Sequence, residues 1–217
     1  MDFKIVFSDI DGTILNSEHR MLKGTLDAIF ALKKANIPFV IATARGPSGV
    51  RPIFKRYGFT CPMICYSGAL IIDENDKIMY SEGFDADDAR DIISYIEAEK
   101  IDCTWNIYSE ELWIVNDRND RLVRAEEEIV EVCATEGGIE LLPKDALIGK
   151  LLCICEPEAI CGIENELKNH RFLNPLAPIN QEQQLYYFYT GNGIKSDGYT
   201  FYVIDDKEKE HHEKHVG

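Results

Sequence analysis

The chain has 217 residues, of which 45% are hydrophobic and 28% are charged, and its formal net charge is −15. This length allows one large domain or two modest ones with a real core, and the negative charge argues against nucleic acid or an anionic membrane as a main partner. Because the first residues contain no basic stretch followed by an apolar one, and no apolar run is long enough to cross a bilayer, we expect a cytoplasmic protein without a signal peptide.

The first predicted element is a strand that ends at two carboxylates. Residues 5–7 form an apolar run that is typical of a strand buried on both faces, and Asp9, Asp11, Gly12 and Thr13 follow it. Alternate side chains of an extended chain point the same way, so both carboxylates can leave the strand on one side, while Gly12 allows a sharp turn. The pair repels unless a cation lies between its members, which indicates a Mg²⁺ site. The alternative is an ordinary β-turn, in which Asp and Gly are common.

The next segment predicts a second strand beside the first. Apolar residues recur at helical spacing between residues 22 and 36, and residues 37–42 read as a buried strand that ends at Thr43, Ala44 and Arg45. A strand, a helix and a strand in this order make a βαβ unit with parallel strands. Since open α/β sheets bind ligands at the carboxyl ends of such strands, we expect Asp9, Asp11 and Thr43 to converge.

The remaining elements change character along the chain. Hairpins mixed with helices from Gly83 onward indicate an α+β domain inserted into the first one. The expected elements are a helix over 48–57 stopped by Gly58, a strand over 63–66 leading to Ser67 and Gly68, a hairpin of 70–72 with 77–80, a helix capped by Asp85, a hairpin of 103–108 with 112–115, a helix from Asp120 to Gly137, a strand over 150–155, a helix starting at Pro157, and short strands near 171–173 and 185–189.

These elements predict an α/β fold class with a defined domain order. Residues 1–82 and 191–217 form a doubly wound parallel (Rossmann-like) core that is incomplete at the carboxyl end, and residues 83–190 form the inserted α+β domain. The seven cysteines form no C-x-x-C pair, so neither a zinc site nor a redox pair is indicated and reduced, mostly buried thiols are expected.

The motif over residues 9–13, together with residues 43–45 after a βαβ unit, resembles the haloacid dehalogenase superfamily of phosphohydrolases. The later segment 66–69, its hairpin and the large insertion are similar to the Cof-type sugar-phosphatase branch. The resemblance implies that Asp9 is the nucleophile that forms an aspartyl-phosphate and that Asp11 is the general acid and base. It also implies that Mg²⁺ lies between Asp9, the phosphate and the backbone carbonyl of Asp11.

The same resemblance implies a phosphate and substrate site and a cap over it. The implied contacts come from Gly12, Thr43, Ala44, Arg45, Ser67 and Gly68, with Ser67 standing where the branch usually has Asn. The inserted domain would close over the site and select the substrate. Trp105, Asn106 and Trp113 could face the ligand, although burial of both tryptophans in the cap core is the favoured interpretation.

The carboxyl-terminal motifs of this family fit the chain poorly. Lys195 is the best match for the phosphate-binding Lys, and Asp205 or Asp206 for the acidic residues that complete the metal site. Asp205 follows Lys195 by only ten positions, which is about the length of a crossover helix alone. We therefore expect missing core strands, an exposed apolar edge at residues 4–8 and self-association through that edge, with residues 199–204 as the best replacement strand.

The sequence thus predicts a Mg²⁺-dependent phosphatase that hydrolyses a small phosphorylated metabolite, expected to be a sugar phosphate. One alternative is a catalytically impaired relative that binds phosphometabolites, acts as an interaction protein or has no independent function. Another is transfer of the phosphoryl group to a second sugar, since this reaction shares the chemistry of Asp9.

Overall fold

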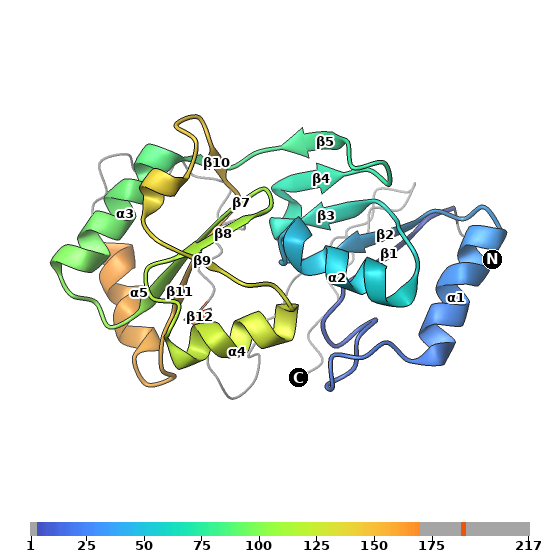
Figure 1. Ribbon diagram of the computed structural model, residues 1–217, viewed down its shortest axis with the longest axis horizontal. Coiled ribbons are helices and arrows are strands. Elements are labelled where there is room, and N and C mark those ends of the chain that lie inside the picture. Colours follow the sequence, from blue (N-terminus) through green and yellow to red (C-terminus); the bar gives the residue numbers. More distant parts are fainter. Residues whose placement is uncertain (1–3, 170–187, 190–217) are drawn as a thin grey trace, which may run out of the picture.

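The computed structural model describes residues 4–169 and 188–189, which form two larger sheets flanked by helices (Figure 1). The helices are α1 (Lys23–Lys34), α2 (Pro47–Tyr57), α3 (Ala86–Ala98), α4 (Arg121–Val130) and α5 (Ile160–Asn169), with 3-10 turns η1 (Tyr66–Gly68) and η2 (Ile139–Leu141). The strands are β1 (Val6–Ser8), β2 (Phe39–Ala42), β3 (Met63–Cys65), β4 (Leu70–Ile72), β5 (Ile78–Ser81), β6 (Phe84–Asp85), β7 (Thr104–Ser109), β8 (Leu112–Val115), β9 (Thr135–Glu136), β10 (Leu147–Ile148), β11 (Lys150–Ile154) and β12 (Phe188–Tyr189).

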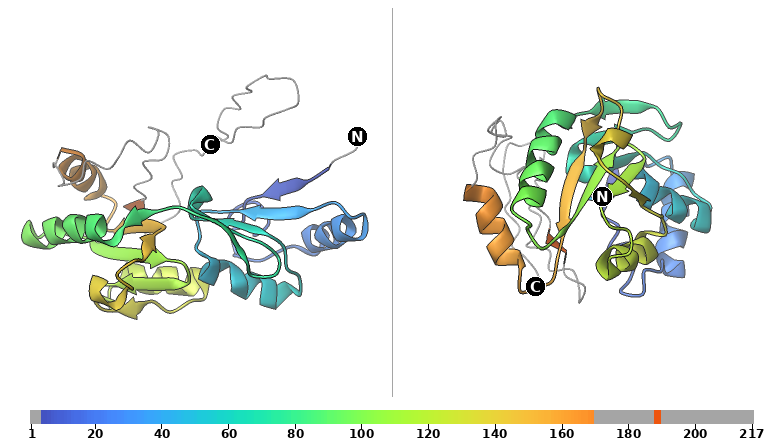
Figure 2. Two further views of the ribbon diagram at one scale, coloured as in Figure 1. Left: turned by 90° about the horizontal axis from the view of Figure 1, so that it is seen from above. Right: turned by 60° about the vertical axis from the view of Figure 1, so that its left-hand side comes forward.

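The first sheet confirms the α/β class and the predicted βαβ unit. Its strand order is β1-β2-β3-β4-β5, in which β1, β2 and β3 are parallel and the hairpin β4–β5 extends the sheet in antiparallel fashion. Ser8 pairs with Ile41, so the carboxyl ends of β1 and β2 lie side by side. Helices α1 and α2 cover the same face of the sheet (Figure 2), as right-handed crossovers between sequential parallel strands require. The second helix layer of a doubly wound fold is not among the described residues.

The prediction that residues 5–7 are buried on both faces is wrong. Ile5 is 44% exposed and Phe7 is 56% exposed. In the described part of the chain β1 pairs with β2 alone, and α1 and α2 cover only one face of the sheet (Figure 2), so alternate side chains of β1 remain uncovered. The expected apolar edge is present among these residues, and self-association through it stays a prediction.

The second sheet has the order β12-β11-β7-β8-β9 and carries helices on both faces. Helices α3 and α5 pack on one face, around Trp105 and Ile107. Helix α4 packs on the other face, where its apolar side joins Trp113 and Leu152 to the core beneath the first sheet. The short pair β6–β10 lies where the chain enters this part of the molecule. The domain boundaries stay a prediction, because residues 171–173 and 191–217 lie outside the described residues.

Two helix ends in the second sheet's domain differ from the prediction. Asp120 caps α4 as expected, since its Oδ1 accepts from the backbone N–H groups of Leu122 at 2.7 Å and Val123 at 3.4 Å. The helix stops at Val130 and not at Gly137, because Glu131 takes a left-handed conformation with φ of 58°. Helix α5 begins at Ile160, three residues after Pro157. All seven cysteines are free thiols, and none of the helices in the described ranges has the length and apolar character of a membrane span.

Tyr66 joins the two sheets. Its hydroxyl donates to the backbone carbonyl of Glu110 in the β7–β8 turn at 2.6 Å, and its ring lies 6.3 Å from that of Tyr108. A Cβ atom at Gly46 would lie 2.3 Å from the Tyr66 hydroxyl oxygen, and one at Gly149 would lie 2.5 Å from the ring. Both glycines therefore allow the ring to pack between the sheets.

Gly149→Ala should destabilise the protein because the new methyl group collides with the Tyr66 ring. Overpacking of this kind costs about 1–3 kcal/mol of unfolding free energy, measured by urea denaturation. Gly24→Ala is the matched control, since a Cβ there meets nothing within 4 Å, and in helix α1 it should stabilise by about 0.5–1 kcal/mol. A Gly149→Ala variant as stable as the parent would show that the Tyr66 ring is not confined in this way.

Candidate active site

The loop after β1 is held by buried apolar side chains. Ile10 has no exposed surface, Ile14 and Leu15 are buried, and the Leu15 N–H donates to the Ile10 carbonyl at 2.9 Å. Gly12 has φ of +74°, a value that favours glycine. The loop is thus a compact turn that fixes Asp9 and Asp11 beside the end of β2.

Arg45 links this loop to the segment after β2. Its Nε donates to Asp11 Oδ2 at 2.8 Å and its Nη2 to Asp11 Oδ1 at 2.6 Å, while Nη1 donates to the Gly49 carbonyl at 3.3 Å. The Arg45 side chain is 9% exposed and that of Asp11 is 24% exposed, so water screens this pair weakly. The backbone N–H of Arg45 donates to Thr43 Oγ1 at 3.1 Å. Arg45 thus connects Asp11 to the segment of Thr43, and the roles of Asp9, Asp11 and Thr43 stay predictions.

Asp9 sits in a different environment from Asp11. Burial raises its pKa, and the Asp11 charge raises it further, whereas the Ile10 backbone N–H and the Arg45 charge oppose these effects. An ionised Asp9 is therefore short of compensating positive charge.

The donor set around Asp9 is compatible with Mg²⁺. The described residues contain no group of three or more His, Cys, Asp or Glu side chains that could hold a metal. Mg²⁺ is commonly bound by one or two carboxylates, waters and substrate phosphate and needs no all-protein cage, so Asp9 and a backbone carbonyl of this loop suffice as protein ligands.

The loops after β2 and β3 meet at the same edge of the sheet. The Tyr66 N–H donates to the Arg45 carbonyl at 3.1 Å, and the Ser67 N–H donates to the Thr43 carbonyl at 3.0 Å. Ser67 is exposed with φ of 54°, and Gly68 has φ of 112°. Ala44 is partly buried between Thr43 and Arg45. Lys195 and Asp205 lie outside the described residues, so their proposed roles stay predictions.

The aromatic residues of the second sheet belong to its interior. Trp105 is 2% exposed, Trp113 is 4% exposed and Asn106 has no exposed surface. The Trp113 Nε1–H donates to Asn106 Oδ1 at 2.9 Å. The two tryptophans are core residues, as the favoured interpretation of the sequence expected, and Asn106 is buried with them.

Two charged residues of the second domain were missed by the sequence interpretation. Glu126 on α4 is 8% exposed, and its Oε2 has no hydrogen-bond partner. Burial raises the pKa of Glu126, and the charges of Lys150 and Arg45 oppose that rise. Burial lowers the pKa of Lys150, and the charge of Glu126 opposes that fall. The signal in the sequence is the spacing of residues 122, 126 and 130, which places Glu126 on the apolar face of the helix.

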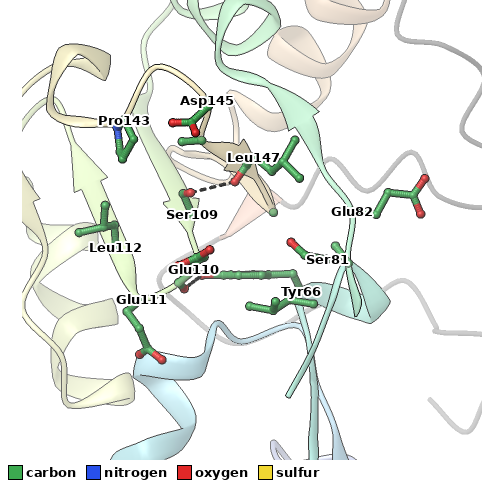
Figure 3. A pocket seen from close by; sticks show the side chains of 14 residues that line it. Tyr66, Ser81, Glu82, Ser109, Glu110, Glu111, Leu112, Pro143, Asp145 and Leu147 are labelled. Atoms are coloured by element: carbon green, nitrogen blue, oxygen red, sulfur yellow. Dashed lines mark hydrogen bonds between the residues drawn. The ribbon is translucent and has the colours of Figure 1, made fainter. Parts of the chain in front are cut away.

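A hollow of about 320 Å³ is lined by Tyr66 and by residues of the second sheet's domain, and none of its lining residues belongs to the loop of Asp9 and Asp11 (Figure 3). Glu82, Glu110, Glu111 and Asp145 are among its lining residues, which include no lysine or arginine. An anionic phosphate would be repelled there. This hollow is therefore distinct from the site around Asp9.

The profile of the haloacid dehalogenase-like hydrolase family matches residues 6–208. The chain belongs to this family. A putative phosphatase from Haemophilus influenzae is 34% identical over 172 residues, which cover 77% of this chain and 63% of that protein. A glucosyl-3-phosphoglycerate/mannosyl-3-phosphoglycerate phosphatase from Persephonella marina is 36% identical over 67 residues, which cover 31% of this chain and 25% of that protein.

The fold of this haloacid dehalogenase-like chain is also found among solved structures. A haloacid dehalogenase-like hydrolase from Bacteroides thetaiotaomicron matches with a TM-score of 0.67 at 19% identity, over 76% of this chain and 63% of that one. The chain thus spans less than two thirds of the length of each of these three proteins.

The two loop carboxylates should affect stability in opposite directions. In metal-free buffer, Asp11→Asn should lower the unfolding free energy by roughly 1–3 kcal/mol, because it leaves the Arg45 guanidinium without its anionic partner. Asp9→Asn should leave stability unchanged or raise it, because it removes a carboxylate whose ionisation burial and Asp11 disfavour.

The sign of the Asp9 effect depends on pH. Because the pKa of Asp9 is raised in the folded state, Asp9 lowers the unfolding free energy as the pH rises above 3.8, the ordinary pKa of an Asp side chain. The gain in stability from Asp9→Asn should therefore vanish below about that pH. Thermal unfolding of both variants between pH 3 and 7 measures this. An Asp9→Asn variant less stable than Asp11→Asn at pH 7 would contradict the assignment of the ion pair.

Proposed function

We propose that this chain is a Mg²⁺-dependent phosphatase that hydrolyses a small phosphorylated metabolite, a sugar phosphate, through an aspartyl-phosphate on Asp9. The observation that carries the proposal is that two neighbouring carboxylates at the end of a parallel strand have different partners. Arg45 occupies both oxygens of Asp11 and leaves Asp9 as the carboxylate that can attack phosphorus. The proposal also rests on the family and on the relatives named as phosphatases.

The chemistry divides into two steps at one phosphorus atom. In the first, an Asp9 oxygen bonds to phosphorus, the bond from phosphorus to the ester oxygen breaks, and Asp11 gives its proton to the departing alcohol. In the second, Asp11 takes a proton from water, water oxygen bonds to phosphorus, and the bond between Asp9 and phosphorus breaks to release orthophosphate.

Thr43 would hold the phosphate during both steps. Its Oγ1 accepts the Arg45 N–H, and because a hydroxyl has a single donor, that donor remains available for a phosphate oxygen. The backbone N–H groups near Gly12 provide further donors. Asp9 and the backbone carbonyl of Asp11 would hold Mg²⁺, which when bound neutralises charge on the transferring phosphoryl group.

Two observations support a sugar phosphate as the substrate: the name of one relative, and the positive charges near the acid loop. The printed name of the Persephonella marina relative describes a phosphatase of glycosylated phosphoglycerates. With an overall charge of −15, an anionic substrate depends on local cations, and the acid loop has Arg45, His19 and Lys150 in its neighbourhood.

A second candidate function is binding of a phosphometabolite without turnover. The observation that favours it is the same ion pair, because a carboxylate held on both oxygens by a guanidinium is a poor proton donor. Hydrolysis requires that Arg45 and Asp11 separate or rearrange when substrate arrives.

Release of 4-nitrophenol from 4-nitrophenyl phosphate separates the two candidates. The full chain should hydrolyse this ester with Mg²⁺ and lose activity with EDTA. Asp9→Asn should abolish turnover, and Asp11→Asn should lower it by roughly 10²–10⁴-fold while Mg²⁺ binding persists. Asp27→Asn on α1, where the side chain is 60% exposed, is the matched control and should leave the rate unchanged. Turnover that survives Asp9→Asn would refute the nucleophile, and binding without any turnover would favour the second candidate.

A further inference from the structure

Glu126 and Lys150 approach the active site from the second sheet's domain. Val130 lies one turn beyond Glu126 on the same side of α4, and a Cβ atom at Gly49 would lie 3.7 Å from Val130 Cβ and 3.6 Å from Arg45 Cβ. This side of α4 therefore faces the segment that carries Arg45. Lys150 opens β11, and its Nζ lies 5.0 Å from the centre of the Tyr108 ring, at the junction of the two sheets.

The two charges share an electrostatic environment with the acid loop. The Glu126 carboxylate interacts with the charges of Lys150, Arg45, Asp11 and His19. Lys150 in turn interacts with Glu126, Arg45 and Asp11. An anion and a cation from the second sheet's domain thus interact with the charges of the proposed general acid and of Arg45.

The neighbouring glutamate on α4 does have hydrogen-bond partners, unlike Oε2 of Glu126. The adjacent Glu127 is also 8% exposed, yet it accepts from Arg118 Nε at 2.6 Å and from the Ala134 N–H at 2.7 Å. Oε2 of Glu126 has no such partner. Because a buried acceptor without a donor is costly, a donor supplied by a ligand would offset that cost.

We propose that Glu126 and Lys150 recognise a hydroxyl group of the alcohol that leaves from the phosphate, and so select polyhydroxylated phosphate esters. This inference rests on the proposed phosphatase function. A hydroxyl can donate to Glu126 and accept from Lys150 at the same time. An ammonium group cannot accept from Lys150 and is repelled by it and by Arg45. A second phosphate or a carboxylate cannot donate to Glu126 and is repelled by it.

The test compares hydroxylated esters with an ester that has no hydroxyl group. Rates of orthophosphate release, as kcat/KM, are measured for glycerol 3-phosphate, erythrose 4-phosphate, glucose 6-phosphate, fructose 6-phosphate and methyl phosphate. The parent should prefer at least one hydroxylated ester over methyl phosphate. Glu126→Met removes the acceptor at similar length and should lower that preference by roughly 10- to 100-fold, the worth of one hydrogen bond to a charged group.

Two further variants separate recognition from folding. Glu126→Gln keeps one acceptor oxygen and should lose less of the preference than Glu126→Met. Glu128→Gln changes an exposed carboxylate two residues further along α4. It should change kcat/KM neither for the hydroxylated esters nor for methyl phosphate. Because Oε2 of Glu126 has no partner, Glu126→Met should unfold at a Tm no lower than that of the parent.

Ligand-induced rises in Tm distinguish failure of this inference from failure of the phosphatase proposal. If no ester is hydrolysed, the phosphatase proposal fails. Recognition of the hydroxyl group can still be measured in that case. A hydroxylated ester should then raise the Tm of the parent more than methyl phosphate does, and this difference should be absent in Glu126→Met. The inference would be overturned if the parent showed no preference for hydroxylated esters over methyl phosphate in either measurement. It would also be overturned if Glu126→Met lowered kcat/KM for all esters, methyl phosphate included, by the same factor.

Discussion

The paired hydrogen bonds between Arg45 and Asp11 set the arrangement on which the site depends. Parallel pairing brings the ends of β1 and β2 together, but the loops beyond them carry no ladder of backbone hydrogen bonds. The Arg45 guanidinium connects these two loops, because it binds Asp11 and also the segment that Thr43 and Gly49 position. The same contact distinguishes two neighbouring carboxylates: Asp11 is neutralised, whereas Asp9 is held partly buried without a direct cation. In the proposed mechanism, Asp9 would therefore require a metal ion, and Asp11 would have to be released from Arg45 before it could transfer a proton.

The second domain completes this arrangement from the opposite side. Tyr66 connects the β3 loop to the β7–β8 turn, and ion pairs of Arg51 with Asp76 and Glu111 tie α2 to the same region. Helix α4 packs against the segment that carries Arg45. Of its two neighbouring buried glutamates, Glu127 is satisfied by protein groups whereas Oε2 of Glu126 is not. On the proposed function, local charge would draw in a phosphate ester despite the negative net charge, and the second sheet's domain would discriminate between leaving groups. The two proposals assign catalysis to the loops of the first sheet and selection of the leaving group to the second sheet's domain.

Most of the first sheet and the catalytic loop could be predicted from sequence because their signals are local. The apolar strand over 37–42, the turn at Gly12 and the parallel crossover require only neighbouring residues, and the structure has them. The burial of residues 5–7 could not be predicted, because it depends on which strand or helix lies across β1. The end of α4 at Val130 and not at Gly137 reflects tertiary contacts, since Glu127 accepts the Ala134 N–H and fixes the chain as it leaves the helix. Glu126 and Lys150 were missed because their electrostatic interaction with Arg45 joins residues far apart in sequence.

A crystal of the full chain soaked with Mg²⁺ and beryllium fluoride tests the central claim most directly. Beryllium fluoride mimics a phosphoryl group on a carboxylate, so the account predicts that it bonds to an Asp9 oxygen, with Mg²⁺ between Asp9, the fluoride and the backbone carbonyl of Asp11, and with the Thr43 hydroxyl donating to a fluorine. Fluoride bonded to Asp11, or bound in the hollow lined by Glu82 and Glu110 while Asp9 stays unmodified, would contradict it.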